Sequence, residues 1–388
     1  MNSNIIGWAH TKFGKLADET LESLIVTVAT EALEHSGLAA QEIDVVYLGH
    51  FNAGFSAQDF TASLVLQADS GLRFKPVTRV ENACATGSAA VHHAVASING
   101  GQARTALVVG VEQMTMASAE AIGSNLLKAS YLPESAGIAG GFAGVFGQIA
   151  DRYYQRYGDQ TDALALIAAK NHANGVKNPL AQLRKEFSFE FCRSESSANP
   201  RVAGPLKRTD CSPVSDGAAA IVLASDDVAR TSRRSVRFRS IAHVQDFLPL
   251  AKRDILAFEG CSVAWRNAMA NAGISLDDLS FVETHDCFTI AELLEYEAMG
   301  LTKPGQGASA IREGWTRTNG KLPVNPSGGL KAKGHPIGAT GVSMHVLSAM
   351  QLCQEAGEMQ IAGASLAGVY NMGGAAVANY VSILEAKR

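Results

Sequence analysis

The feature that most constrains the fold of this chain is an internal repeat. The segment EALEHSGLAAQEIDVVYLGH, which begins at Glu31, has the same pattern as NAMANAGISLDDLSFVETHD, which begins at Asn267. Each contains a helical stretch, a glycine that ends it, an acidic linker and a short apolar strand. A second pair follows in the same order: CATGSAAVHHA at Cys84 and GATGVSMHVLSA at Gly338. Two matches in one order predict a duplicated βα unit.

Strand-like and helix-like patterns alternate along most of the sequence. We expect helices over residues 19–35 and 255–272. We expect strands over residues 45–51, 77–81, 106–111, 218–224, 236–244, 281–284, 361–369 and 375–383. Alternation of this kind is typical of an α/β fold, and it predicts largely parallel, buried sheets with helices on their faces.

The repeat also predicts how the chain is divided. The chain has 388 residues, of which 47% are hydrophobic, and is large enough for two packed units. We assign residues 1–116 and 207–235 to an N-terminal half and residues 236–388 to a C-terminal half. Residues 117–206 are glycine-rich and basic, and we expect them to form an inserted loop or lid domain.

Two interpretations of this insertion stay open. It forms either a helical cap whose cations face solvent, or a lid whose cations bind a phosphate-bearing ligand. The cations concerned are Lys177, Arg184, Lys185, Arg193 and Arg201.

Charge and cysteine content exclude several classes of protein. The formal net charge of -4 predicts no broad attraction to nucleic acid or to membranes. The apolar residues 361–384 include two asparagines and are broken by Gly373 and Gly374, so we interpret them as two buried strands around a glycine turn rather than a membrane span. The six cysteines form no C-x-x-C pair and no signal peptide precedes them, which favours free thiols and a cytoplasmic location.

The stretch VENACATGSAAVHHA places Cys84 where a strand-like run gives way to a helix. Backbone N–H groups at the start of a helix favour a thiolate, which is the nucleophilic form of cysteine. The small residues around it, Ala83, Ala85, Gly87 and Ser88, leave room for a substrate. The alternative is a buried and unreactive cysteine, which is the commoner fate of this residue.

Two further motifs carry titratable side chains. In NPSGGLKAKGHPIGATG, His335 lies between a glycine and a proline, and its imidazole suits removal of a thiol proton. The alternative is a structural turn. In VETHDCFTIAELLEYEAMGL, His285 and Cys287 lie two residues apart at a strand end and so point to one side. Two ligands at this spacing match a zinc site poorly, so we expect no metal. The glycine-rich NMGGAAVAN offers either N–H groups for an anion or a plain turn.

In this order, the motifs resemble those of the thiolase superfamily along essentially the whole chain. NACATGSAA resembles the nucleophile motif, GHPIGATG a family signature, and SPVSDGAAA a further family segment. HDCF resembles the sterol-carrier-protein branch of the thiolases. The resemblance implies a five-layer αβαβα fold built from duplicated βαβαβαββ halves, with an inserted loop domain.

The resemblance also implies a role for each motif. Cys84 would take up an acyl group, His335 would deprotonate Cys84, and Cys287 would move the proton at the substrate α-carbon. His285 and His335 would form one oxyanion hole, and the backbone N–H groups of Cys84 and Gly373 a second. Ser212 would contact the pantetheine arm of coenzyme A.

At one position the chain departs from the commoner family pattern. Most thiolases carry Asn-Glu-Ala-Phe in place of HDCF, and take their second cysteine from a C-x-G segment near the C-terminus. Here Asn371 occupies that C-terminal position. The HDCF branch supplies the second cysteine as Cys287, and His285 stands in place of the family's asparagine.

The implied function is that of a coenzyme-A-dependent acyltransferase, which cleaves 3-ketoacyl-CoA by thiolysis or forms it by Claisen condensation. Coenzyme A is a substrate, and no permanently bound cofactor is expected. A homodimer or homotetramer is expected. The alternatives are a thiolase-like acyltransferase or carbon–carbon lyase that acts on a different acceptor, with or without a partner protein, and a non-catalytic acyl-CoA binder.

Overall fold

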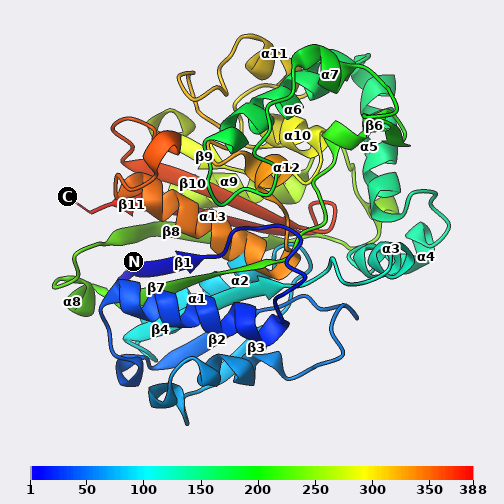
Figure 1. The fold of residues 1–388 in the computed structure, drawn as a ribbon. Helices are drawn as coiled ribbons and strands as arrows, with labels where there is room; N and C mark the ends of the chain where they lie inside the picture. The colour runs from blue at the N-terminus through cyan, green and yellow to red at the C-terminus, as the bar shows by residue number, and fades with distance from the viewer. Residues whose placement is uncertain (1, 388) are drawn as a thin grey trace.

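The computed structural model describes residues 2–387. Nine strands form one mixed sheet, in the order β3-β2-β4-β7-β1-β8-β11-β10-β9 (Figure 1). These strands are β1 (Ser3–His10), β2 (Val45–Gly49), β3 (Val77–Val80), β4 (Thr105–Glu112), β7 (Gly217–Ser225), β8 (Val236–Gln245), β9 (Phe281–Glu283), β10 (Leu366–Gly373) and β11 (Ala378–Ala386). The short strands β5 (Arg201–Ala203) and β6 (Leu206–Lys207) form a separate hairpin.

The helices pack on both faces of the two halves of this sheet. They are α1 (Leu21–Ser36), α2 (Thr86–Asn99), α3 (Ala119–Leu127), α4 (Leu132–Ser135), α5 (Gly141–Tyr157), α6 (Thr161–Val176), α7 (Phe189–Arg193), α8 (Asp226–Ala229), α9 (Glu259–Ala272), α10 (Thr289–Ala298), α11 (Gly307–Arg312), α12 (Gly329–Lys333) and α13 (Ile337–Leu352). Helix α1 covers the outer face of β1, β4 and β7, and α9 covers β8 and β11. Helices α2 and α13 pack on each other between the halves, which gives the predicted αβαβα layers (Figure 1).

Strand order and helix position confirm the duplication. The N-terminal half has the order β3-β2-β4-β7-β1. The C-terminal half has the order β9-β10-β11-β8, which corresponds to β2-β4-β7-β1. Val324, which pairs with Val282 of β9, takes the place of β3. Helices α1 and α9 end at Gly37 and Gly273, whose φ angles of 75° and 65° are left-handed and suit glycine. Within the sheet, the two halves are joined by two residue pairs between β1 and β8.

The prediction of largely parallel sheets is wrong. Only the pairings β2–β3, β2–β4 and β9–β10 are parallel among those of the described sheet, and the others are antiparallel. Strands β10 and β11 are joined by a tight turn, and an antiparallel pair needs no crossover helix. The turn confirms the interpretation of residues 361–384 as two buried strands, although β10 begins later than predicted. Within residues 2–387 no helix combines the length and apolarity that crossing a bilayer requires. Strand β1 was not predicted.

The segment between β4 and β7 contains α3 to α7 and the hairpin β5–β6. Helix α6 packs on α10, α11 and α12 of the C-terminal half. The insertion therefore covers the elements that carry the HDCF and GHP motifs, as Figure 1 shows at the upper right. Its proposed limits, residues 117–206, stay a prediction.

Backbone contact between the first turns of α2 and α13 positions the motifs. A Cβ atom added to Gly87 would lie 2.8 Å from the backbone nitrogens of Gly341 and Val342. One added to Gly338 would lie 2.3 Å from the carbonyl oxygen of Val111. Such distances leave no room for any side chain. The start of each helix is therefore held against the other, and so are the loops that precede them.

We expect the substitution Gly87→Ala to destabilise the protein by about 1–3 kcal/mol, because the methyl group forces two helix backbones apart. Urea unfolding followed by circular dichroism measures this. Gly123→Ala is the matched control, because Gly123 lies in α3 and a Cβ there meets nothing within 4 Å. That control gains about 0.5–1 kcal/mol from helix propensity. Equal unfolding midpoints for the two variants would contradict the packing argument.

Candidate active site

The loop between β3 and α2 holds Cys84 in a turn shaped by Thr86. The Thr86 hydroxyl donates to the carbonyl of Ala83 at 2.6 Å and accepts from the N–H of Asn82 at 2.8 Å. Ala83 has a positive φ of 48°, which a turn of this tightness requires. The side chain of Cys84 is buried, with 4% of the residue exposed.

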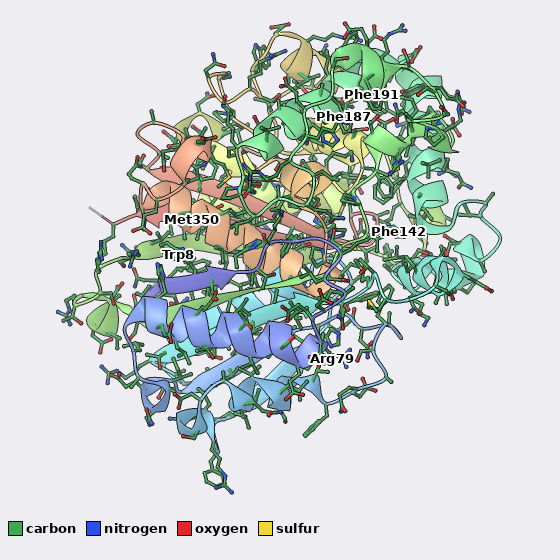
Figure 2. The ribbon with its side chains drawn as sticks, in the orientation of Figure 1. Trp8, Arg79, Phe142, Phe187, Phe191 and Met350 are labelled. Atoms are coloured by element: carbon green, nitrogen blue, oxygen red, sulfur yellow. The ribbon has the colours of Figure 1, made fainter. Side chains whose placement is uncertain are left out.

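Apolar side chains from distant parts of the chain surround Cys84. Its buried neighbours in this cluster are Phe51, Met114, Ala129 and Ile337, and the partly buried ones are Ala53, Phe55, Ala83, Leu126, Phe142 and Val214. Figure 2 shows Phe142 at the start of α5, beside the end of the central sheet. The apolar cluster that includes Cys84 suits an acyl chain more than a charged group.

Burial raises the pKa of the Cys84 thiol to about 12. The backbone N–H groups of Gly374 and of Cys84 itself act in the opposite direction, and the carboxylates of Glu112 and Glu81 reinforce the rise. The expectation that the helix start holds Cys84 as a thiolate is wrong, because the cost of burying a charge outweighs the few N–H groups available. In the resting protein Cys84 is a neutral thiol.

The backbone donor that faces the sulfur comes from Gly374. The oxyanion hole implied by the family resemblance uses the N–H of the preceding residue, Gly373, which lies in β10 opposite Ala378 of β11; that role stays a prediction. Gly374 is the first residue of the following turn and has a φ of 62°. Glycine adopts this left-handed conformation freely, and the N–H of Gly374 acts on the sulfur of Cys84.

The structure brings both predicted histidines to Cys84. One ring nitrogen of His285, one of His335 and the sulfur of Cys84 lie within 4.8 Å of one another. The two rings are perpendicular, with centroids 5.1 Å apart. Residues from three motifs that are remote in the sequence therefore meet at one point.

Hydrogen bonds determine which nitrogen of His335 is protonated. Its Nδ1 lies 2.7 Å from the hydroxyl of Thr340, and that hydroxyl donates its only proton to the carbonyl of Pro336 at 2.9 Å. The hydroxyl can therefore only accept from the ring, so Nδ1 carries the proton and Nε2 keeps a lone pair. Burial and the charge of Lys333 lower the pKa of His335 to about 3, which keeps the ring neutral.

His285 is fully buried and contacts Asn371 of β10. The amide nitrogen of Asn371 lies 2.9 Å from His285 Nδ1 and 3.0 Å from the carbonyl oxygen of Cys84. The Nε2 atom of His285 has no hydrogen-bond partner among the described residues. Burial and the nearby His335 and Lys333 lower the pKa of His285 well below its ordinary value.

Cys287 is a neighbour of both Cys84 and the Ser212 segment. The negative charge of a Cys84 thiolate adds to the rise in the pKa of Cys287, whose main cause is burial. The carbonyl of Cys287 accepts a hydrogen bond of 2.9 Å from the N–H of Ser212. The Ser215 hydroxyl, three residues on, accepts from the N–H of His335 at 2.9 Å. The segment that begins at Ser212, which was predicted to contact coenzyme A, is thus hydrogen-bonded to the HDCF motif and to the motif that contains His335.

Two buried carboxylates, which the sequence analysis missed, tie the loops together. Asp286 accepts from the N–H groups of Leu330 at 2.6 Å and Lys331 at 3.2 Å, which joins HDCF to the loop that leads to His335. Glu112, at the end of β4, accepts from the N–H groups of Phe51, Asn52 and Gly338 at 3.0–3.1 Å. The available signal was an acidic residue at or shortly after the end of an apolar strand: Glu112 is the last residue of β4, and Asp286 lies three residues after β9.

A cavity of about 690 Å³ lies beside this centre. Ser212 and Val214 line it, and Val214 also packs in the apolar cluster around Cys84. Cationic side chains line it as well: Lys15, Lys185, Arg208 and the buried Lys331. The rings of Phe187 and Phe191 stack at 4.7 Å on its wall beside α7 (Figure 2).

The five cations predicted in the insertion have different surroundings. Lys185 lines the cavity. Arg193 and Arg201 form ion pairs with Asp162 and Glu195, and Arg184 donates to a backbone carbonyl. Lys177 is exposed. The insertion therefore acts in part as a cap with solvated charges, while one of its cations faces the cavity.

The sulfur of Cys84 and one ring nitrogen each of His285 and His335 are also close enough together to bind one metal ion. In this structure Nδ1 of each histidine is already engaged, by Asn371 or by Thr340. The expectation of no metal stays a prediction.

Two family models together match nearly the whole chain. The model described as "Thiolase, N-terminal domain" matches residues 3–227, and "Thiolase C-terminal domain-like" matches residues 243–386. The chain is 36% identical over 373 residues to an acetyl-CoA acetyltransferase of Methanothermobacter thermautotrophicus, covering 95% of this chain and 96% of that protein. It is 35% identical over 320 residues to sterol carrier protein 2 of Homo sapiens, covering 78% of this chain and 57% of that protein.

Solved structures share the fold. One described as "Ltp2-ChsH2(DUF35) aldolase" has a TM-score of 0.84 at 18% identity and covers 100% of this chain and 98% of its own. The acetyl-CoA acetyltransferase from Syntrophomonas wolfei has a TM-score of 0.72 at 19% identity, with 100% of both chains covered.

The neutral state of Cys84 has a consequence for its reactivity. We expect its alkylation by iodoacetamide to accelerate about tenfold per pH unit from about pH 7 to about pH 9, because the thiolate is a minor species throughout. Mass spectrometry of the Cys84 peptide over time gives the rate. Glutathione is the reference thiol, and its rate levels off near an ordinary thiol pKa. A plateau for Cys84 close to neutral pH would show a preformed thiolate and contradict the assignment.

Proposed function

The chain belongs to the thiolase family, as its motifs predicted, and on that premise we propose that it is a coenzyme-A-dependent acyltransferase. It cleaves 3-ketoacyl-CoA by thiolysis or forms it by condensation of two acyl-CoA molecules. The observation that carries this proposal is the meeting of Cys84, His285 and His335 within 4.8 Å. Cys287 lies two residues after His285, and a charge on Cys84 raises its pKa. The similarity to sterol carrier protein 2 agrees with the branch that HDCF indicates.

Acylation of Cys84 is the first step. The sulfur attacks the keto carbon of the substrate while its proton passes to Nε2 of His335, the nitrogen left free by the Thr340 contact. Because Cys84 has a high pKa and His335 a low one, the proton moves together with formation of the C–S bond. The N–H groups of Cys84 and Gly374 hold the oxygen that becomes negative, so we place this oxyanion hole at Gly374 rather than Gly373.

Carbon–carbon cleavage follows. The bond between the keto carbon and the α-carbon breaks, its electron pair passes to the leaving thioester as an enolate, and Cys287 donates a proton to the α-carbon. His285, and His335 now protonated at Nε2, donate hydrogen bonds to the enolate oxygen. One such donor typically contributes a factor of about 10²–10³ in rate. The thiol of coenzyme A then gives its proton to the Cys287 thiolate and attacks the acyl carbon. The bond from that carbon to the Cys84 sulfur breaks, and Cys84 takes back its proton from His335.

The cavity next to the site is the proposed coenzyme A pocket. Ser212 and Val214 lie at the end that contacts the Cys84 cluster, where the pantetheine arm must enter. Lys15, Lys185 and Arg208 supply positive charge for phosphates. The stacked pair Phe187 and Phe191 offers an aromatic face to the adenine. No metal or resident cofactor takes part in these steps.

A homodimer or homotetramer is part of the proposal and rests on the family resemblance alone. A cytoplasmic location is also part of the proposal and rests on the cysteine pattern of the sequence. The lyase alternative is less well supported. The chain shares the fold of a structure described as an aldolase, at 18% identity, but it retains Cys84, His285, Cys287 and His335 together.

Incubation with an acyl-CoA is expected to add one acyl group to the Cys84 peptide, detected by mass spectrometry. Cys84→Ala is expected to remove both the adduct and the thiolysis of 3-ketoacyl-CoA. Cys353→Ala, at the half-buried end of α13, should keep both. An intact protein that is never acylated on Cys84 would refute the proposed function.

Substitution of Cys287 is expected to separate the two half-reactions. Cys287→Ala keeps the exchange of label between acetyl-CoA and free coenzyme A, because that exchange needs only Cys84 and His335. Thiolysis of 3-ketoacyl-CoA falls by about 10²–10⁴, the usual contribution of a positioned acid. Equal losses in exchange and thiolysis would mean that Cys287 does not act at the α-carbon.

The cations of the cavity are expected to affect substrate affinity and not turnover. Arg208→Ala and Lys185→Ala should each raise KM for coenzyme A by about fivefold, with kcat unchanged, because exposed charges contribute about 1 kcal/mol or less. Lys177→Ala, an exposed cation of the insertion outside this cavity, serves as the control. An unchanged KM in all three variants would place the phosphates elsewhere.

A further inference from the structure

Asn371 is a polar residue in the middle of a buried strand. It lies in β10, opposite Tyr380 of β11, and it is fully buried. An amide in such a place is costly unless its hydrogen bonds are made. The parallel register of β10 with β9 pairs Val369 with Glu283, so two residues further along the strands Asn371 comes beside His285.

The contacts of Asn371 fix the orientation of its amide. The carbonyl oxygen of Cys84 only accepts hydrogen bonds, so the atom 3.0 Å from it is the NH₂ group. The second hydrogen of this group points to Nδ1 of His285 at 2.9 Å. Nδ1 therefore accepts, and in the neutral ring the proton is on Nε2. That N–H is buried and has no partner among the described residues.

The two histidines of the site are thus held in opposite tautomers. Thr340 accepts from Nδ1 of His335 and leaves Nε2 as a lone pair. Asn371 donates to Nδ1 of His285 and leaves Nε2 as an N–H. One ring is arranged to accept a proton and the other to donate a hydrogen bond, although the residue type is the same. A buried, unpartnered donor is a group prepared for a negatively charged atom of a ligand.

We propose that Asn371 is a positioning residue that locks His285 in the Nε2–H tautomer, and that this tautomer is what allows His285 to stabilise the enolate oxygen. The first half of this inference concerns the resting protein alone, and the second half rests on the proposed function. By donating also to the carbonyl of Cys84, Asn371 links the nucleophile loop to the same donor.

The tautomer can be measured without substrate. In protein labelled with ¹⁵N at its 10 histidines, the ring nitrogens of His285, assigned through the His285→Asn variant, are expected to show an unprotonated Nδ1 and a protonated Nε2. Asn371→Asp replaces the donor with an acceptor of the same shape, and the proton is expected to move to Nδ1. A protonated Nδ1 in the unaltered protein would overturn the proposal.

Kinetics test the second half. Asn371→Asp is expected to lower kcat for thiolysis about 100-fold with KM changed less than about twofold, because the lost donor acts in the transition state. The new carboxylate raises the pKa of His285, so lower pH adds a proton to Nε2 and restores the donor. The activity of the variant relative to the unaltered enzyme should therefore rise from about pH 9 to about pH 6. A ratio independent of pH would indicate a merely structural defect.

A double-mutant cycle completes the test. In His285→Asn the donor is an amide that has no tautomers, so adding Asn371→Asp should cost less than about threefold further. A full additional loss of about 100-fold would show that Asn371 acts independently of His285. If the unaltered protein catalyses no acyl transfer at all, the proposed function fails, whereas the NMR result still decides whether Asn371 sets the tautomer.

Discussion

The site depends on the contact between the first turns of α2 and α13, where Gly87 and Gly341 bring two backbones together without side chains. Each helix is preceded by a motif loop, one ending in Cys84 and the other containing His335. A larger residue at the crossing would separate the sulfur from its base by the width of a methyl group or more. The proposed proton transfer requires Cys84 and His335 to lie within hydrogen-bond distance, so the proposed catalysis depends on the geometry of this helix crossing.

Burial then determines the electrostatics. Four titratable side chains are enclosed with little solvent, so each prefers its neutral form: thiols for the cysteines and uncharged rings for the histidines. These four groups themselves carry no charge before the substrate arrives, although the charges of Lys333 and Glu112 act on them. Charge appears only during the reaction, at oxygens that face fixed N–H donors, and there the dry surroundings strengthen each hydrogen bond.

The sequence was sufficient for the fold family and the duplicated halves, and its motifs named the four side chains that we propose for the site, because these depend on motif order and on residue type. Properties that depend on tertiary contacts could not be predicted from the sequence. The raised pKa of Cys84 comes mainly from burial, and no local pattern joins Cys84 to Phe51, Met114 and Ile337 of its apolar cluster. Whether the N–H of Gly373 or that of Gly374 lies near Cys84 depends on where the hairpin turn after β10 begins. From the sequence, Asn371 was notable only because it stands where most thiolases have their second cysteine. Its contact with His285 could not be predicted, because it depends on the register of β9 and β10.

The duplication also explains how two helix starts came to differ in chemistry. Thr86, the first residue of α2, and Thr340, the fourth residue of α13, occupy matched places in the sequence repeat, and each donates its hydroxyl proton to a carbonyl three or four residues earlier. Each oxygen keeps a lone pair. In the N-terminal half it accepts from the N–H of Asn82 and shapes the turn that presents Cys84. In the C-terminal half the same lone pair accepts from Nδ1 of His335. Threonines at matched places of the repeat thus use the same two hydrogen-bonding functions of a hydroxyl group, to present the nucleophile in one half and to select the tautomer of its base in the other.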